Sequence, residues 1–144
     1  MRPKVQVVFD CLDPESLSEF YAKALGYKLQ DPPKGFKSWE EALTAWKVPE
    51  EEWHSSSAIV DPDSKGPRIY FQRMDTPKHG KNRVHLDVNA SEGPSVPLQR
   101  RKKQVRARVE RLKKLGAKED SELEENGEYW VIMLDPERNE FCVQ

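Results

Sequence analysis

Cysteine, long hydrophobic runs and net charge are all scarce in this 144-residue sequence, and each scarcity excludes a class of protein. Two cysteines are too few for the disulfide scaffold of a small secreted protein, which favours a reduced, cytoplasmic protein. No apolar run approaches the roughly 18 residues of a transmembrane helix and no signal-peptide pattern is present, so we expect a soluble protein without a membrane partner. The formal net charge of −1 gives no overall field that would attract nucleic acid.

What the sequence does contain is an internal repeat. Residues 21–28 (YAKALGYK) return as residues 111–118 (RLKKLGAK), and an apolar, strand-like run precedes each copy. Duplicated units tend to pair face to face, so matching positions are expected to converge on one shared cleft. We therefore expect a single domain made of two repeats. The domain covers residues 1–144, the repeats lie approximately at 4–75 and 82–144, and an insert at about 31–55 belongs only to the first repeat.

Alternation and helix-capping signals locate the elements of each repeat. Asp13 and Pro14 are typical of a helix start, and Gly26 is typical of a helix end. The first half is predicted to contain strands at 5–9, 27–30, 57–60 and 68–74. The second half is predicted to contain strands at 83–89, 117–119, 128–134 and 139–143, a helix at 98–115 and an acidic turn region at 119–128. The order strand-helix-strand-strand-strand, twice, predicts an α+β fold of two small mixed sheets, each covered by a helix.

Three motifs occur in order along the chain: DPESLSEFY at 13–21, NRVHLDV at 82–88 and DPERNEF at 135–141. Together they resemble the vicinal oxygen chelate superfamily, which includes glyoxalase I, bleomycin-resistance proteins, fosfomycin-resistance enzymes and extradiol dioxygenases. The likeness is closest to the glyoxalase-like domain proteins and spans essentially the whole chain. It implies two βαβββ repeats that form a paired, cupped mixed sheet with outer helices. It also implies a homodimer, since relatives commonly dimerise.

Strand alternation predicts a polar face on each sheet. On the strand that carries His85, the apolar file is Val84, Leu86 and Val88, and His85 and Asp87 lie on the opposite side. The same reasoning assigns Gln6, Asp10, Tyr70, Gln72, Asn89, Glu140 and Cys142 to the polar faces.

The resemblance places one metal ligand on each of four strands, and Gln6, His85 and Glu140 occupy three of these positions. An amide oxygen, an imidazole nitrogen and a carboxylate suit Zn²⁺, Ni²⁺, Co²⁺, Fe²⁺ or Mn²⁺. The fourth position lacks the glutamate of glyoxalase I. Its candidates, Tyr70 and Gln72, are poor bases near neutral pH, which makes lactoylglutathione lyase activity unexpected and leaves Glu140 as the candidate catalytic base. The predicted substrate-pocket residues are Tyr70, Gln72, Asp87, Trp46 and Cys142.

Most of these residues also have an alternative role that the sequence leaves open. His85 and Glu140 can form a hydrogen-bonded pair in a polar cavity without any metal. Gln6 alone is more often a structural polar residue than a ligand. Asp87 is equally suited to capping or ion pairing at the end of a strand.

The insert is predicted to contain a short helix that begins at Ser38, with Glu41 at the spacing of a capping box. Trp39, Leu43 and Trp46 then project from one side of that helix. They form either the core of a local cluster or a hydrophobic lid over the cavity.

Residues 100–114 contain nine basic residues, which raises the question of nucleic-acid binding. Glu110 interrupts the basic run, the acidic region 119–128 follows it, and an aliphatic stripe commits one side of the helix to the sheet. We therefore interpret the basic residues as a solvated helix face. Lys78, Lys81 and Arg83 are a separate basic group that can meet an anionic substrate.

Two functions remain. The first is a metal-dependent enzyme of the lyase, isomerase or dioxygenase type, acting on a small substrate with adjacent oxygen functions. The second is a metal-free protein of the bleomycin-resistance type that sequesters an aromatic or planar small molecule. Histidine and glutamate at two ligand positions favour the first. The missing fourth-strand acid and the Trp-rich insert favour the second.

Overall fold

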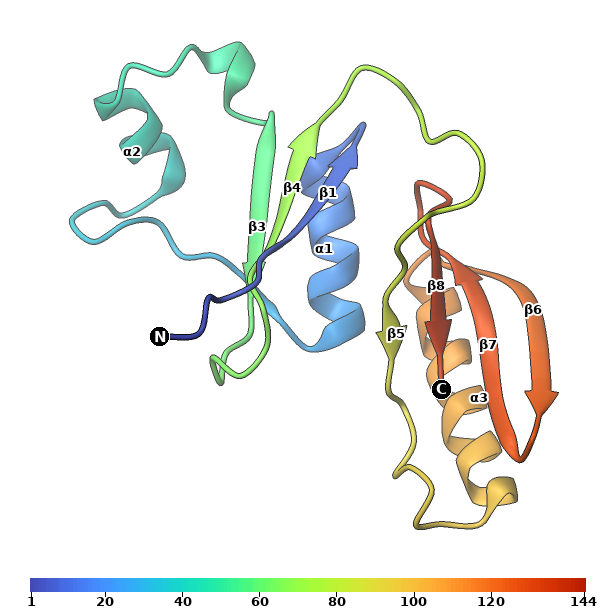
Figure 1. Ribbon diagram of the computed structural model, residues 1–144. Helices are drawn as coiled ribbons and strands as arrows, with labels where there is room; N and C mark the ends of the chain where they lie inside the picture. Colours follow the sequence, from blue (N-terminus) through green and yellow to red (C-terminus); the bar gives the residue numbers. More distant parts are fainter. The chain divides into compact units, whose positions relative to one another are not determined.

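The computed structural model describes residues 1–144, which divide into two compact units, Met1–Pro77 and Lys78–Gln144 (Figure 1). Each unit contains one four-stranded mixed sheet with a long helix, and both units follow the order strand-helix-strand-strand-strand. The predicted α+β fold with two βαβββ repeats is confirmed. The boundary between the units falls between Pro77 and Lys78.

The first unit carries the insert within its repeat. Its elements are β1 (Val7–Cys11), α1 (Pro14–Leu25), β2 (Lys28–Leu29), α2 (Trp39–Ala45), the 3-10 helix η1 (Glu50–Glu52), β3 (Ser56–Val60) and β4 (Ile69–Arg73). The strands lie in the order β1-β4-β3-β2, with β1 parallel to β4 and the other pairs antiparallel. Helix α1 packs on this sheet through Leu17, Phe20 and Tyr21, which are almost fully buried.

The caps of α1 follow from its sequence. The Asp13 carboxylate accepts a hydrogen bond of 3.0 Å from the backbone N–H of Ser16, which satisfies one of the free donors at the helix start. Pro14 occupies the first turn, where its missing N–H is not needed. Gly26 ends the helix with a φ of 73°, a left-handed conformation that glycine adopts without a Cβ clash. The capping signals therefore fixed both ends of this helix.

The second unit repeats the topology with longer antiparallel strands. Its elements are β5 (Asp87–Val88), α3 (Leu98–Lys114), β6 (Lys118–Glu125), β7 (Glu128–Leu134) and β8 (Glu140–Val143). The strand order is β5-β8-β7-β6, and β5 is parallel to β8. Helix α3 buries Val105, Val109 and Leu112 against this sheet, whose core side chains include Val131 and Met133.

Strands β5 and β1 begin later than the sequence predicts. The regular ladder of β5 covers only Asp87–Val88, and Val84 is 82% exposed instead of lying in the apolar file. Strand β1 begins at Val7, since its partner β4 begins at Ile69 and the two residues are in register. For β1 the start of the neighbouring strand limits the ladder, and alternation along one strand does not report that start.

The acidic segment after α3 is the main correction to the predicted elements. Residues 119–125 were expected to form a turn region, but they belong to β6, which pairs along its length with β7. The turn itself is confined to Asn126 and Gly127, whose φ angles are 52° and 78°. An Asn-Gly pair between two strands is the strongest short-range signal for a hairpin, so the sequence did contain the information.

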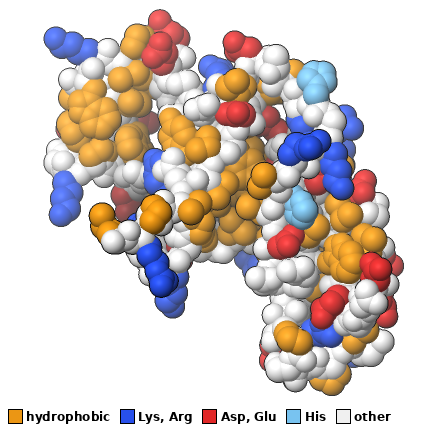
Figure 2. Space-filling model, viewed as in Figure 1, with side chains coloured by type: hydrophobic (Ala, Val, Ile, Leu, Met, Phe, Trp, Pro, Cys, Tyr) orange, Lys and Arg blue, Asp and Glu red, His pale blue; other side chains and the backbone are white.

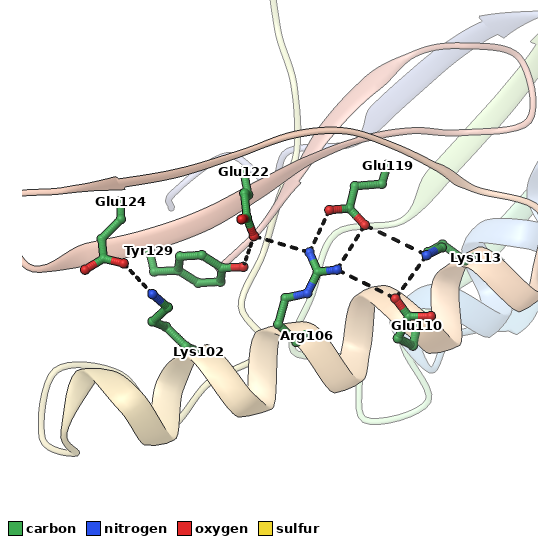
Figure 3. A network of polar contacts seen from close by, with 8 residues as sticks. All are labelled: Lys102, Arg106, Glu110, Lys113, Glu119, Glu122, Glu124 and Tyr129. Carbon is green, nitrogen blue, oxygen red and sulfur yellow. Dashed lines mark hydrogen bonds and ion pairs between the residues drawn. The ribbon is translucent and has the colours of Figure 1, made fainter.

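Ion pairs with α3 explain why so acidic a strand is tolerated (Figure 3). Arg106 Nη1 lies 2.6 Å from Glu119 Oε1 and 3.5 Å from Glu122 Oε2. Lys102 pairs with Glu124, and Lys113 contacts both Glu110 and Glu119. Much of the basic face of α3 is therefore matched to carboxylates of its own unit, in agreement with its interpretation as a solvated helix face.

The surface shows no accumulation of one charge on the face seen in Figure 2, where basic and acidic side chains are interspersed. No helix is both long enough and apolar enough to span a bilayer.

Candidate functional site

The polar face of the second sheet is built by β5 and β8, which run parallel with Asp87 opposite Cys142. His85 precedes Asp87 by two residues, so both side chains project to the same side. Phe141 and Val143 are buried on the side that α3 covers, and Cys142 therefore faces the other way. The register brings an imidazole, a carboxylate and a thiol to one patch.

These three side chains form a compact donor cluster. His85 Nε2 lies 3.3 Å from Asp87 Oδ1. The candidate ligand atoms of His85, Asp87 and Cys142 all lie within 4.8 Å of one another. His85 and Asp87 are about half exposed, with side-chain accessibilities of 45% and 47%, and Cys142 is partly buried. The cluster can therefore be reached from solvent.

A cavity of about 600 Å³ adjoins the cluster. His85, Asp87 and Cys142 line it together with Trp130 of β7, Tyr129 of β7 and Arg101 of α3. The wall thus combines potential metal donors with aromatic surface, the combination expected where a small molecule binds.

The electrostatic setting of Cys142 opposes free thiolate formation. Burial raises the pKa of its thiol, and the charge of Asp87 together with a hydrogen bond to Asp87 raises it further. Lys81 acts in the opposite direction but does not reverse the shift. Cys142 is therefore a protonated thiol at neutral pH, unless a cation at the cluster replaces the proton.

Glu140, which the sequence predicts as a metal ligand and base, contacts Lys78 and the backbone of Asn82. Its carboxylate lies 3.1 Å from Lys78 Nζ and accepts a hydrogen bond of 3.0 Å from the backbone N–H of Asn82. Lys78 and Glu140 are both largely buried, with side-chain accessibilities of 18% and 21%. Glu140 lines a second cavity of about 380 Å³ with Lys78 and Arg138.

The pKa of Glu140 follows from these contacts. Burial alone would raise it, but the backbone hydrogen bond from Asn82 and the Lys78 ammonium together hold it below its usual value. Glu140 is therefore ionised at neutral pH, and the cation beside it weakens it as a base.

Gln6 lies in the first unit, where Arg68 engages it. Arg68 Nη1 donates a hydrogen bond of 2.8 Å to Gln6 Oε1, which is the atom that a metal would use. Arg68 also donates to Gln30 Oε1 at 2.6 Å and lies 5.2 Å from the centre of the Tyr70 ring. Arg68 thus organises this polar face, and strand alternation alone gave no indication of that role.

Tyr70 and Gln72 project from the same side of β4, as alternation predicts. The Gln72 side-chain amide donates a hydrogen bond of 2.9 Å to Asp10 Oδ1 on the neighbouring strand. Neither residue supplies a carboxylate at this position, so the departure from glyoxalase I persists in the structure.

The insert helix α2 forms with the predicted Ser38 cap, whose hydroxyl accepts a 3.1 Å hydrogen bond from the N–H of Glu41. Its most buried residue is Ala42, whereas Trp46 is 52% exposed and packs edge-on against Phe36. Trp39 donates its indole N–H to the Gln30 carbonyl at 2.8 Å. The tryptophans therefore take part in local contacts of the first unit, and the assignment of Trp46 to a substrate pocket stays a prediction.

Sequence reasoning missed the cavity residues Trp130 and Arg101. Trp130 was detectable, because it alternates with the buried Tyr129 and Val131 and must face the polar side of the sheet. Arg101 was hidden within the basic run of α3. It donates hydrogen bonds to Glu128 and to the Gly127 carbonyl, at 2.7 and 2.8 Å.

The family model described as "Glyoxalase-like domain" matches residues 6–144. The chain belongs to this family. This glyoxalase-like domain has no significant match among curated proteins.

Solved structures support the same fold at low sequence identity. A glyoxalase/bleomycin resistance protein/dioxygenase family enzyme from Burkholderia phytofirmans PsJN is 17% identical, with a TM-score of 0.63 over 96% of this chain and 94% of that one. A possible glyoxalase from Bacillus cereus is 14% identical, with a TM-score of 0.62 over 100% and 99% of the two chains. A fosfomycin resistance protein from Listeria monocytogenes, FosX, complexed with Mn(II) and 1S,2S-dihydroxypropylphosphonic acid, is 11% identical, with a TM-score of 0.63 over 100% and 90%.

Proposed function

We propose that this glyoxalase-like domain is a metal-dependent enzyme that acts on a small substrate with two adjacent oxygen atoms. One observation carries the proposal: His85 lines a cavity of about 600 Å³ with two further potential donors beside it. The reaction belongs to the lyase, isomerase or dioxygenase classes of the vicinal oxygen chelate superfamily. The structural neighbour complexed with Mn(II) and a dihydroxy compound supports this choice of substrate chemistry.

The donor chemistry of the chain fits a divalent transition metal. His85 offers an imidazole nitrogen as the first ligand. The resemblance adds Gln6 and Glu140, a set that suits Zn²⁺, Ni²⁺, Co²⁺, Fe²⁺ or Mn²⁺. When bound, such an ion supplies a Lewis acid that stabilises negative charge on the substrate oxygens.

Glu140 is the proposed base, and its contacts define what this role requires. A carboxylate paired with a cation is a weak base. The Lys78 ammonium must therefore move away from Glu140 or form its ion pair with an anionic substrate instead. A substrate with a negatively charged group would meet Lys78 directly, so turnover is expected to favour anionic substrates.

The remaining proposed contacts concern substrate shape. Asp87 and Cys142 lie in the cavity with Trp130, whose indole suits a planar or apolar substrate portion. Tyr70, Gln72 and Trp46 are proposed contacts on the strength of the resemblance and of strand alternation.

A metal-free binding protein is the second candidate, and a specific observation favours it. The charge of the Glu140 carboxylate is balanced by Lys78, and the Asn82 N–H donates a hydrogen bond to it. The largely buried carboxylate therefore needs no metal to compensate its charge. In that case the cavity with Trp130 would bind a planar molecule directly.

Elemental analysis separates the two functions. We expect protein purified without chelators, or saturated with Zn²⁺ or Ni²⁺ and then desalted, to retain about one ion per chain. His85→Ala should reduce this to background, because the imidazole is common to every ligand set. His54→Ala is the matched control, since His54 lies in the first unit and pairs with Glu15. Wild-type protein that retains no metal would overturn the enzyme proposal in favour of the binding protein.

A further inference from the structure

We propose that the metal is held by His85, Asp87 and Cys142, a thiolate-containing set supplied by the second unit alone. This inference rests on the proposed metal dependence and replaces Gln6 and Glu140 in its ligand set. Asp87 and Cys142 lie on the adjacent parallel strands β5 and β8, and His85 lies two residues before β5.

Strand pairing holds two of the three donors in place. His85 and Asp87 are two residues apart, so their side chains emerge on one side of the strand, and Cys142 is the register partner of Asp87. The ladder continues at both sides of this pair through hydrogen bonds from the Cys142 N–H to the Leu86 carbonyl and from the Gln144 N–H to the Val88 carbonyl, at 2.9 and 3.0 Å. Asp87 and Cys142 therefore lie on hydrogen-bonded backbone, and His85 directly precedes it.

The donor separations suit a tetrahedral ion. Ligand bonds of about 2.0 to 2.3 Å imply donor-to-donor distances of roughly 3.3 to 3.7 Å around such an ion. His85 Nε2 and Asp87 Oδ1 are 3.3 Å apart, and no pair in the cluster exceeds 4.8 Å. Side-chain rotations that shift an atom by about an ångström therefore complete the site.

The alternative ligands are engaged with cations of the protein. Glu140 pairs with Lys78, and the Gln6 side-chain oxygen accepts a hydrogen bond from Arg68. A positive side chain beside each of these oxygens opposes the binding of a metal cation there. In contrast, His85, Asp87 and Cys142 contact one another.

The ligand types also indicate which metal binds. Imidazole, carboxylate and thiolate together favour Zn²⁺ or Co²⁺ over the harder Mn²⁺. Three protein ligands would leave a tetrahedral ion one open position, and the cavity lined by Trp130 adjoins the three donors. That position is available to a substrate oxygen or to water.

Titration with Co²⁺ tests the inference, because a cobalt–thiolate bond produces a charge-transfer band in the near ultraviolet. We expect wild-type protein to develop this band and Cys142→Ser to lose it. Cys11→Ser is the matched control, since Cys11 is the other cysteine, is buried in the first unit, and should leave the band unchanged. Asp87→Asn should weaken Co²⁺ binding by about tenfold or more, since losing even an outer-shell partner of a metal ligand typically costs about 10- to 100-fold.

A second measurement needs no substitution. Saturating Zn²⁺ should protect Cys142 of the wild-type protein from alkylation, measured by mass spectrometry. Equal alkylation of Cys142 with and without Zn²⁺ would overturn the inference.

The outcomes also separate this inference from the proposed function. If Glu140→Gln and Gln6→Ala lose the metal while Cys142→Ser and Asp87→Asn retain it, the ligand set proposed here is wrong and the metal-dependent function stands. If the wild-type protein binds neither Co²⁺ nor Zn²⁺, both proposals are wrong.

Discussion

The ion pairs between α3 and β6 allow a worked prediction of stability. Glu119→Gln removes the charge that accepts two hydrogen bonds from Arg106, at 2.6 and 3.2 Å. Charged hydrogen bonds in shielded positions contribute about 1.5 to 3 kcal/mol. The Arg106 and Glu119 side chains are 37% and 26% exposed, however, so water and salt screen the pair. We therefore expect a loss of about 1 kcal/mol in the free energy of unfolding.

Urea unfolding at neutral pH measures this loss. With a slope of about 1 to 3 kcal/mol per molar urea, a 1 kcal/mol change lowers the midpoint by roughly 0.3 to 1 M. The difference should shrink at high salt, because the side chains are partly exposed.

The same pair gives a pH dependence with a defined sign. Hydrogen bonds from Arg106 lower the pKa of Glu119 from its ordinary value of 4.5, and burial opposes this only in part. A lowered folded-state pKa means that the stabilisation is fully present above the ordinary value and is lost as the pH falls through the folded-state value. Wild type and Glu119→Gln should therefore converge in stability in acid.

A double-mutant cycle decides whether the contact between Arg106 and Glu119 is responsible for the loss in stability. Arg106→Met and Glu119→Gln together should destabilise by less than the sum of the single changes. Arg111→Met is the control, since Arg111 is exposed on the same helix and should cost little. Additive effects of Arg106→Met and Glu119→Gln would refute the reasoning and leave the basic face of α3 available for another role.

Three further predictions concern the fold and its assembly. Asp13→Ala should destabilise the protein by about 1 kcal/mol through loss of the α1 cap, measured by urea unfolding, and Asp13→Asn should restore most of it. Gly127→Ala should cost about 1 to 2 kcal/mol, because the added Cβ meets no other atom but the φ of 78° is unfavourable for alanine; an unchanged urea midpoint would contradict this. The protein is expected to be a homodimer, and a monomer mass in light scattering would exclude that assembly.

Local signals determined most of the secondary structure. Asp13, Pro14 and Gly26 set the ends of α1, and Ser38 set the start of α2, because capping is a contact between neighbours in the chain. The repeated order strand-helix-strand-strand-strand could also be predicted from the sequence, since alternation and helical spacing are properties of short segments. The prediction of a turn region at residues 119–125 was wrong, because the Asn126-Gly127 turn makes these acidic residues the first strand of a hairpin.

Strand alternation also gave the correct faces without giving the partners. It placed His85, Asp87 and Cys142 among the polar positions, and the structure has all three on one side of the second sheet. It could not tell that Asp87 is the register partner of Cys142, because register depends on how β5 and β8 pair.

Only the tertiary structure decided which charges meet. Glu140 carries the same sequence signal whether it faces a metal or a lysine, and the fold of the second unit brings Lys78 to it from 62 residues away. Likewise, Arg68 reaches Gln6 across the same separation of 62 residues. The sequence alone determined most of the elements and their polar faces, since these depend on neighbours along the chain. The partners of each polar side chain depend on long-range pairing, which brings His85, Asp87 and Cys142 together and gives Glu140 and Gln6 cationic partners.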